Sequence, residues 1–232
     1  MNDMTLSDSV RALERDLREI FGGRLQSLVR YGPAAAAGAH DHGGHAYELR
    51  SIRTLAIAET LTADDLRAAA RRATNWHNAG LATPILLAAH EFENALDAFP
   101  LEFGAILADY TVVSGSNPFE GVKVAPADLR RACEVQARSH LLHLRQGYVD
   151  ARDNADALAV LIVDSAPAFD ALLRSLARLQ GSAPSGAGVS EVVALVGVAE
   201  ISSADALRIF PEYLDAVERL VRAIDSWSEG SR

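Results

Sequence analysis

The sequence predicts an α+β fold, with a small mixed sheet and flanking helices followed by an all-α antiparallel helical bundle. The sheet is predicted by two apolar runs, 25–31 and 52–58, on either side of a loop rich in Gly, Ala and His. The bundle is predicted by long amphipathic segments with short connections in the second half. We place the boundary near Pro126, with an α/β domain at 1–125 and the bundle at 126–232.

Composition points to a soluble protein. Of the 232 residues, 49% are hydrophobic and 23% charged, and no apolar run approaches the roughly 20 residues that a bilayer requires. Cys133 is the single cysteine and the N-terminal stretch has no signal-peptide core, so we expect a cytoplasmic protein. The net charge of −9 argues against binding to nucleic acid. Lys123 is the only lysine among 22 basic residues, which suggests a GC-rich bacterial genome.

The first half alternates helical and extended patterns. Apolar residues at helical spacing predict a helix over 7–20, and a strand over 25–31 follows it until Gly32-Pro33. The stretch 48–59 alternates as a second strand. Thr62, with Asp65 three residues later, predicts the capped start of a helix that runs to Gly80.

The rest of this half predicts further strands. Residues 84–89 form a short buried strand, and 90–99 a short helix or turn. Residues 100–115 predict one or two more strands, with Glu102 at a strand end.

The second half predicts four helices. They lie at 127–151, 154–179, 190–198 and 211–227. Pro167 predicts a kink or a break in the second of them. Pro211 suits the first turn of the last.

Several phrases resemble the nucleotidyltransferase superfamily. They are LVRYGP, TLAIAETLTADDLR, FPLEF, VVSGSNPFEG and LLHLRQGYVDARD. The resemblance is to bacterial proteins that join a minimal, kanamycin-type domain to a C-terminal helical bundle, and it implies a nucleotidyltransferase-like sheet. In that superfamily a Gly-Ser pair holds the triphosphate, two acids on the second strand bind two metals, and a third carboxylate serves as ligand or base.

This chain departs from that pattern at its decisive positions. The Gly-Ser pair is Gly32-Pro33, which lacks the hydroxyl and one backbone donor. The two acids fall at Ser51 and Arg53, and a guanidinium repels metal ions. Glu102 keeps the third carboxylate, but one acid cannot hold two divalent ions. Metal-dependent nucleotidyl transfer is therefore not expected, and these five residues are the predicted ligand-binding positions.

The loop between the first two strands holds the densest group of metal-capable side chains. These are His40, Asp41, His42 and His45. Imidazole and carboxylate groups suit zinc, nickel or iron, so a divalent metal at this loop is a candidate cofactor. The alternative is that these are ordinary solvent-exposed histidines in a loop around Gly43-Gly44, with no metal bound.

These observations favour a catalytically degenerate nucleotidyltransferase-like protein. It would keep a cleft between sheet and bundle for a small-molecule or nucleotide-like ligand, or for a protein partner. One alternative is an enzyme with new chemistry, in which Arg53 binds an anionic substrate and Glu102 or His42 acts as acid or base. Another is a homodimeric scaffold or antitoxin-like protein that associates through the apolar helices at 154–180 and 211–227.

Overall fold

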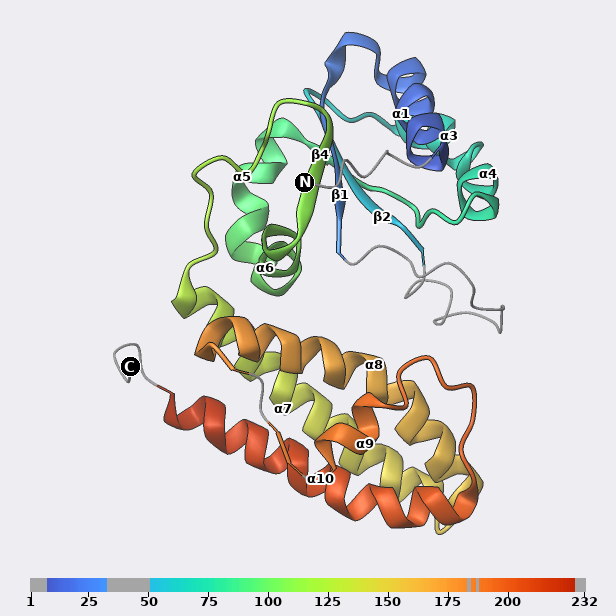
Figure 1. The fold of residues 1–232 in the computed structure, drawn as a ribbon, viewed down its shortest axis with the longest axis vertical. Coiled ribbons are helices and arrows are strands. Elements are labelled where there is room, and N and C mark those ends of the chain that lie inside the picture. The colour runs from blue at the N-terminus through green and yellow to red at the C-terminus, as the bar shows by residue number, and fades with distance from the viewer. Residues whose placement is uncertain (1–7, 33–50, 183–184, 187, 228–232) are drawn as a thin grey trace, which may run out of the picture. The chain divides into compact units, whose positions relative to one another are not determined.

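The chain forms a four-stranded mixed sheet with helices on both faces and, after it, a group of long helices. The computed structural model describes residues 8–32, 51–182, 185, 186 and 188–227 (Figure 1). The chain divides into two units, Met1–Lys123 and Val124–Arg232. In the first unit the elements are α1 (Asp8–Phe21), η1 (Gly22–Arg24), β1 (Leu25–Tyr31), β2 (Arg53–Ala58), α3 (Ala63–Ala70), α4 (Ala73–Asn78), β3 (Ile85–Ala88), α5 (Ala89–Ala98), α6 (Pro100–Ala108) and β4 (Tyr110–Gly115). In the second unit they are α7 (Pro126–Ala151), α8 (Ala155–Gln180), α9 (Val189–Val193) and α10 (Ser203–Ser226).

The strands lie in the order β3-β2-β1-β4. β1 is antiparallel to both β2 and β4, whereas β2 and β3 are parallel, so the sheet is mixed as predicted. β2 is buried from its second residue onward because it lies between two strands and beneath helices on both faces.

One face of the sheet packs against α1, α3 and α4 (Figure 1). α1 contributes residues at three- and four-residue intervals, and the strands contribute every second residue. The buried members of this core are Val10, Leu13, Leu17, Phe21, Leu28, Ala56, Ala58, Ala69, Trp76 and Leu81. The two spacings predicted from the sequence thus meet in one core.

Hydrogen bonds join the start of α3 to Arg24, the residue directly before β1. Thr62 caps the helix, and Asp65 completes the predicted capping box by accepting from the Thr62 backbone N–H at 2.9 Å. The Asp65 carboxylate also accepts two hydrogen bonds from the Arg24 guanidinium, at 2.9 and 2.7 Å. The hydrogen bonds from Arg24 hold the pKa of Asp65 well below its usual range. Burial acts in the opposite direction, and the hydrogen bonds from Thr62 add to the lowering.

α5 and α6 lie on the opposite face (Figure 1). Of the one or two strands predicted over 100–115, one forms, which is β4, because residues 100–108 form α6. Pro100 occupies a first-turn position, and Phe103 and Ile106 are buried one helical turn apart. Glu102 therefore stands in the first turn of a helix and not at a strand end.

The second unit is built from three long helices and the short α9, and α7 packs against both α8 and α10 (Figure 1). Asn154 caps α8 by accepting from the backbone of Asp156 and Ala157, so the turn after α7 is tight. The all-α second unit agrees with the predicted class. Its largest fully buried side chains are Leu144, Ile162, Phe169, Leu172, Leu176 and Tyr213.

A polar network joins the three long helices inside this core. The Tyr213 hydroxyl of α10 lies 2.6 Å from His140 Nε2 of α7 and 3.0 Å from Ser165 Oγ of α8. Phe169 stacks on the His140 ring, with the centroids 5.8 Å apart. Burial, with a smaller contribution from nearby His143, lowers the pKa of His140 to about 4.

Several helices differ from the prediction, including α9, which ends at Val193 and not at residue 198. α8 continues through Pro167, so no break occurs there; Ala166 and Phe169 beside it are fully buried and keep the helix packed. α10 begins at Ser203, so Pro211 lies inside the helix and not in its first turn. The single helix expected between 62 and 80 is divided into α3 and α4.

In the part of the chain that the structure describes, no helix is both long and apolar enough to cross a membrane.

Candidate functional site

Three of the predicted site residues, Gly32, Arg53 and Glu102, lie where β1 ends and β2 begins. Tyr31, the last residue of β1, is paired across the sheet with Arg53, the first residue of β2. Residues in register on antiparallel strands project to the same face, so both side chains lie on the side of α5 and α6. Gly32 follows Tyr31, and Glu102 reaches the same place from the first turn of α6.

Tyr31 forms the floor of this site. Its side chain is buried, whereas Arg53 and Glu102 are exposed. The Arg53 guanidinium carbon lies 5.3 Å from the centroid of the Tyr31 ring, which is a cation–π geometry. The Tyr31 hydroxyl donates to Glu102 Oε1 at 3.4 Å. One buried aromatic ring thus carries a cation on its face and a carboxylate at its hydroxyl.

The phenol of Tyr31 stays protonated in this setting. Burial contributes most to the rise in its pKa, and the Glu102 carboxylate adds to it. The Arg53 cation acts in the opposite direction but is outweighed. Tyr31 can therefore donate a hydrogen bond at neutral pH but cannot serve as a base.

Gly32 makes room for Arg53. A Cβ atom on Gly32 would lie 2.3 Å from Arg53 Nη2, and the backbone φ of +76° also favours glycine. The Gly32 N–H donates to the Asp109 carbonyl at 2.8 Å, which fixes the end of β1 beside the start of β4. Gly32 was predicted as a ligand-binding position, and in this structure its lack of a side chain leaves space for the Arg53 guanidinium.

Ser51 does not reach the surface. It is 6% exposed and precedes Ile52, which forms a parallel bridge with Leu81, before the start of β3. The backbone N–H of Ile52 donates to Gly80 at 2.9 Å. The position that would carry the first metal-binding acid is therefore a buried serine, and the position of the second is an exposed cation.

The remaining predicted residues lie outside the described part of the chain. They are Pro33, His40, Asp41, His42 and His45. The divalent metal at this loop stays a prediction. Within residues 8–32, 51–182, 185, 186 and 188–227, no three His, Cys, Asp or Glu side chains come together in a way that could hold a metal ion.

Sequence reasoning missed Tyr31 as a site residue. It was counted only as the end of an apolar run. Its signal is present, because an aromatic residue directly before the turn glycine faces the first residue of the next strand once the two strands pair.

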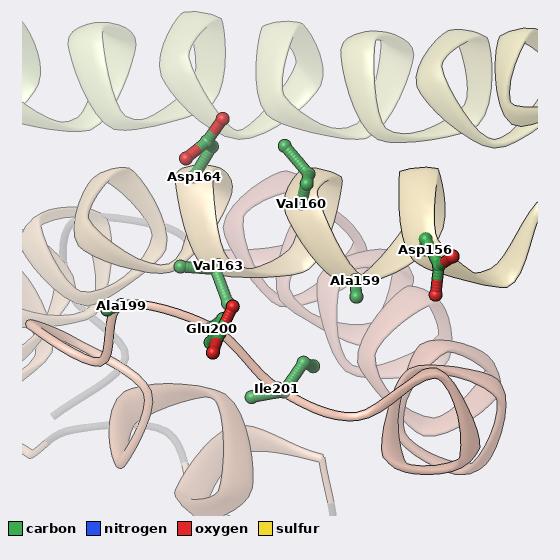
Figure 2. Close-up of a pocket in the computed structure, with 8 residues that line it drawn as sticks. All are labelled: Asp156, Ala159, Val160, Val163, Asp164, Ala199, Glu200 and Ile201. Atoms are coloured by element: carbon green, nitrogen blue, oxygen red, sulfur yellow. The ribbon is translucent and has the colours of Figure 1, made fainter.

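A separate cavity of about 250 Å³ lies in the second unit (Figure 2). It is lined by residues of α8 and of the segment before α10: Asp156, Ala159, Val160, Val163, Asp164, Ala199, Glu200 and Ile201. The three carboxylates do not converge on one point, and Asp156 already accepts a hydrogen bond from Ser203. None of the predicted site residues lines this cavity.

No family model and no curated protein matches the chain. Among solved structures, it is similar to the crystal structure of spectinomycin adenyltransferase AAD(9) from Enterococcus faecialis with ATP and spectinomycin. The TM-score is 0.49 and the identity 8%, over 96% of this chain and 100% of that one. The fold class rests on the sheet and helices described above.

Proposed function

We propose that this chain is a catalytically degenerate nucleotidyltransferase-like protein that binds a small anionic ligand at Arg53. The proposal rests on the Arg53 guanidinium, which is exposed and lies over the buried Tyr31 ring. In the superfamily pattern, a metal-binding acid occupies this position. A guanidinium offers paired donors that match phosphate and carboxylate oxygens. It supplies positive charge where the ancestral site would use metal ions.

The surroundings of Arg53 support binding and not metal-dependent transfer. Strand pairing and the cation–π contact hold the side chain in place, so little order has to be gained when a ligand binds. The Tyr31 hydroxyl donates its one proton to Glu102, so the guanidinium is the group that offers donors to a ligand. Two-metal phosphoryl chemistry needs a cluster of carboxylates, and Glu102 is the one acid that joins this group among the described residues.

The test has two arms. Millimolar ATP or GTP with magnesium and a small hydroxyl acceptor should release no pyrophosphate. ATP or inorganic pyrophosphate, titrated calorimetrically in the presence of a chelator, should still bind. Arg53→Gln should weaken that binding about 10- to 100-fold, the value of one or two charge-assisted hydrogen bonds. Arg71→Gln, at an exposed arginine after α3, is the matched control and should leave affinity unchanged.

Two outcomes count against the proposal. Robust pyrophosphate release would show that transfer chemistry survives. Equal affinity of the wild type and Arg53→Gln for both anions would remove Arg53 from the site.

The second candidate function is an enzyme with new chemistry at the same place. It is favoured by the exposed Glu102 carboxylate, which lies within hydrogen-bonding reach of the Tyr31 hydroxyl beside the anion-binding group. Glu102 would act as acid or base on a substrate that Arg53 holds. Glu102→Gln separates the two functions: a binding protein should keep its affinity, and an enzyme should lose turnover of the bound ligand.

A further inference from the structure

Opposite charges contact the Tyr31 ring without contacting each other. The Arg53 guanidinium carbon lies over the face of the ring, 5.3 Å from its centroid. Glu102 Oε1 lies 3.4 Å from the hydroxyl oxygen at the edge of the ring. In the described part of the chain no ion pair joins Arg53 to Glu102, so their charged atoms are more than 4 Å apart. The ring therefore separates a cation from an anion.

Both charged groups keep hydrogen-bonding capacity for a ligand. A guanidinium has five N–H donors, and Arg53 gives none of them to an acceptor among the residues that the structure describes. A carboxylate can accept several hydrogen bonds, and Glu102 accepts the one from Tyr31 through Oε1. Both side chains are exposed. The site thus offers donors for an anionic group and, beside them, an acceptor for a cationic group.

Glu102 determines which anions suit this site. An anion held by Arg53 lies near the Glu102 carboxylate, and like charges brought close together repel each other. A ligand that also carries a positive group replaces this repulsion with attraction, because its charges then match those of the site. The arrangement therefore favours a ligand with both charges over a ligand that is only anionic.

We propose that the ligand of this site is an aminoalkyl phosphate, a small molecule in which a short chain joins a phosphate to an ammonium group. This ligand class rests on the proposed function, because Arg53 binds the phosphate. Guanidinium donors pair with two phosphate oxygens at once, and an ammonium group is a compact donor that suits the Glu102 carboxylate. Glu102 is then the residue that determines specificity.

Two ligands that differ in one group test the proposal. In propyl phosphate a methyl group takes the place of the ammonium group of 2-aminoethyl phosphate, and the two molecules have the same length. Calorimetric titration of the full chain at low ionic strength should show that 2-aminoethyl phosphate binds about 3- to 10-fold more tightly. This range lies between the values of an exposed ion pair and a charge-assisted hydrogen bond.

Glu102→Gln should remove this preference. The glutamine amide oxygen can still accept the Tyr31 proton, so the change removes the charge and keeps the contact. The affinity for 2-aminoethyl phosphate should fall to that for propyl phosphate, and the affinity for propyl phosphate should not fall. Glu212→Gln, at an exposed glutamate of α10, makes the same change in net charge and should retain the preference. Circular dichroism verifies that both variants fold.

The outcomes separate this ligand class from the anion site on which it rests. Equal affinity of the wild type for the two ligands, with both weakened by Arg53→Gln, would overturn the role of the ammonium group and leave the anion site intact. A preference that survives Glu102→Gln would overturn the role of Glu102. Binding of neither ligand, or binding that Arg53→Gln leaves unchanged, would overturn both proposals.

A lipid headgroup can present the same phosphate and ammonium groups. Vesicles of phosphatidylethanolamine distinguish this source from a free aminoalkyl phosphate. We expect no co-sedimentation of the wild type with these vesicles, because the phosphate of the lipid is a diester with one negative charge. Co-sedimentation that Arg53→Gln and Glu102→Gln each abolish would instead assign the site to a headgroup and overturn a free ligand.

Discussion

His140 links the stability of the second unit to pH. Its pKa is about 4 in the folded chain, against about 6.5 for an exposed histidine, so between these values the unfolded chain binds the additional proton. Burial of neutral His140 therefore makes its full contribution to the free energy of unfolding above about pH 6.5. This contribution is lost as the pH falls toward 4. This contribution to the free energy of unfolding should decrease by about 2 kcal/mol between pH 7 and pH 5, measured by denaturant titration.

The variant His140→Phe isolates this effect. Other groups also titrate in this range, so the informative quantity is the difference between wild type and variant at each pH. His140→Phe should remove about 2 kcal/mol of the pH dependence, whereas His143→Gln, on the exposed side of α7, should retain it. Equal pH dependence in wild type and His140→Phe would contradict the assignment.

The residues around Arg53 illustrate what could be predicted at this scale. Gly32, Arg53 and Glu102 were identified by their positions relative to a superfamily pattern, and the structure brings all three to Tyr31. Tyr31 itself was not identified, because its place beneath Arg53 follows only once the pairing of the two strands is known. That contact depends on the register of β1 with β2, and more than twenty residues separate these two strands in the sequence.

At the scale of elements, Gly115 controls the pairing of β4 with β1. Its φ is +82°, and a Cβ atom there would lie 2.0 Å from the backbone carbonyl oxygen of Gln26. Neither backbone can move without breaking the ladder between the two strands. Gly115→Ala should therefore destabilise the chain by about 3 kcal/mol, combining φ strain with the steric clash.

A second glycine provides the control for Gly115. Gly80 has a φ of +77°, but a Cβ atom there would meet nothing within 4 Å. Gly80→Ala should cost only about 1 kcal/mol, the strain of the backbone conformation alone. Thermal or urea unfolding measures both changes. Similar losses for the two variants would mean that the close approach to Gln26 relaxes.

Predictions of elements succeeded where a local interaction fixes the boundary. Thr62 and Asp65 close a capping box within four residues, and α3 begins where that motif places it. The motif at Ser202 and Asp205 is of the same kind, with the Asp205 N–H donating to Ser202 Oγ at 3.1 Å, and it sets the start of α10 ahead of Pro211. The apolar run in α6 failed for another reason, since short apolar runs do not distinguish a helix from a strand.

At the scale of the whole molecule, the connection between the two units holds the only lysine of the chain. Lys123 is exposed, and each unit has a buried core of its own. A lysine-specific endoprotease should therefore cut the native chain once, into fragments 1–123 and 124–232. Both fragments should keep their circular dichroism and unfold cooperatively after separation. Loss of helical signal from the 124–232 fragment would show that the helices depend on the sheet.

The network of His140, Ser165 and Tyr213 has a consequence for how the three long helices align. Each helix contributes one member, and sliding any helix by one turn would move its member about 5.4 Å, beyond the reach of a hydrogen bond. The displaced arrangement would leave polar groups buried without partners. Leucine and valine contacts can exchange one neighbour for another with little loss, so the three polar groups are what fixes the position of each helix along the others.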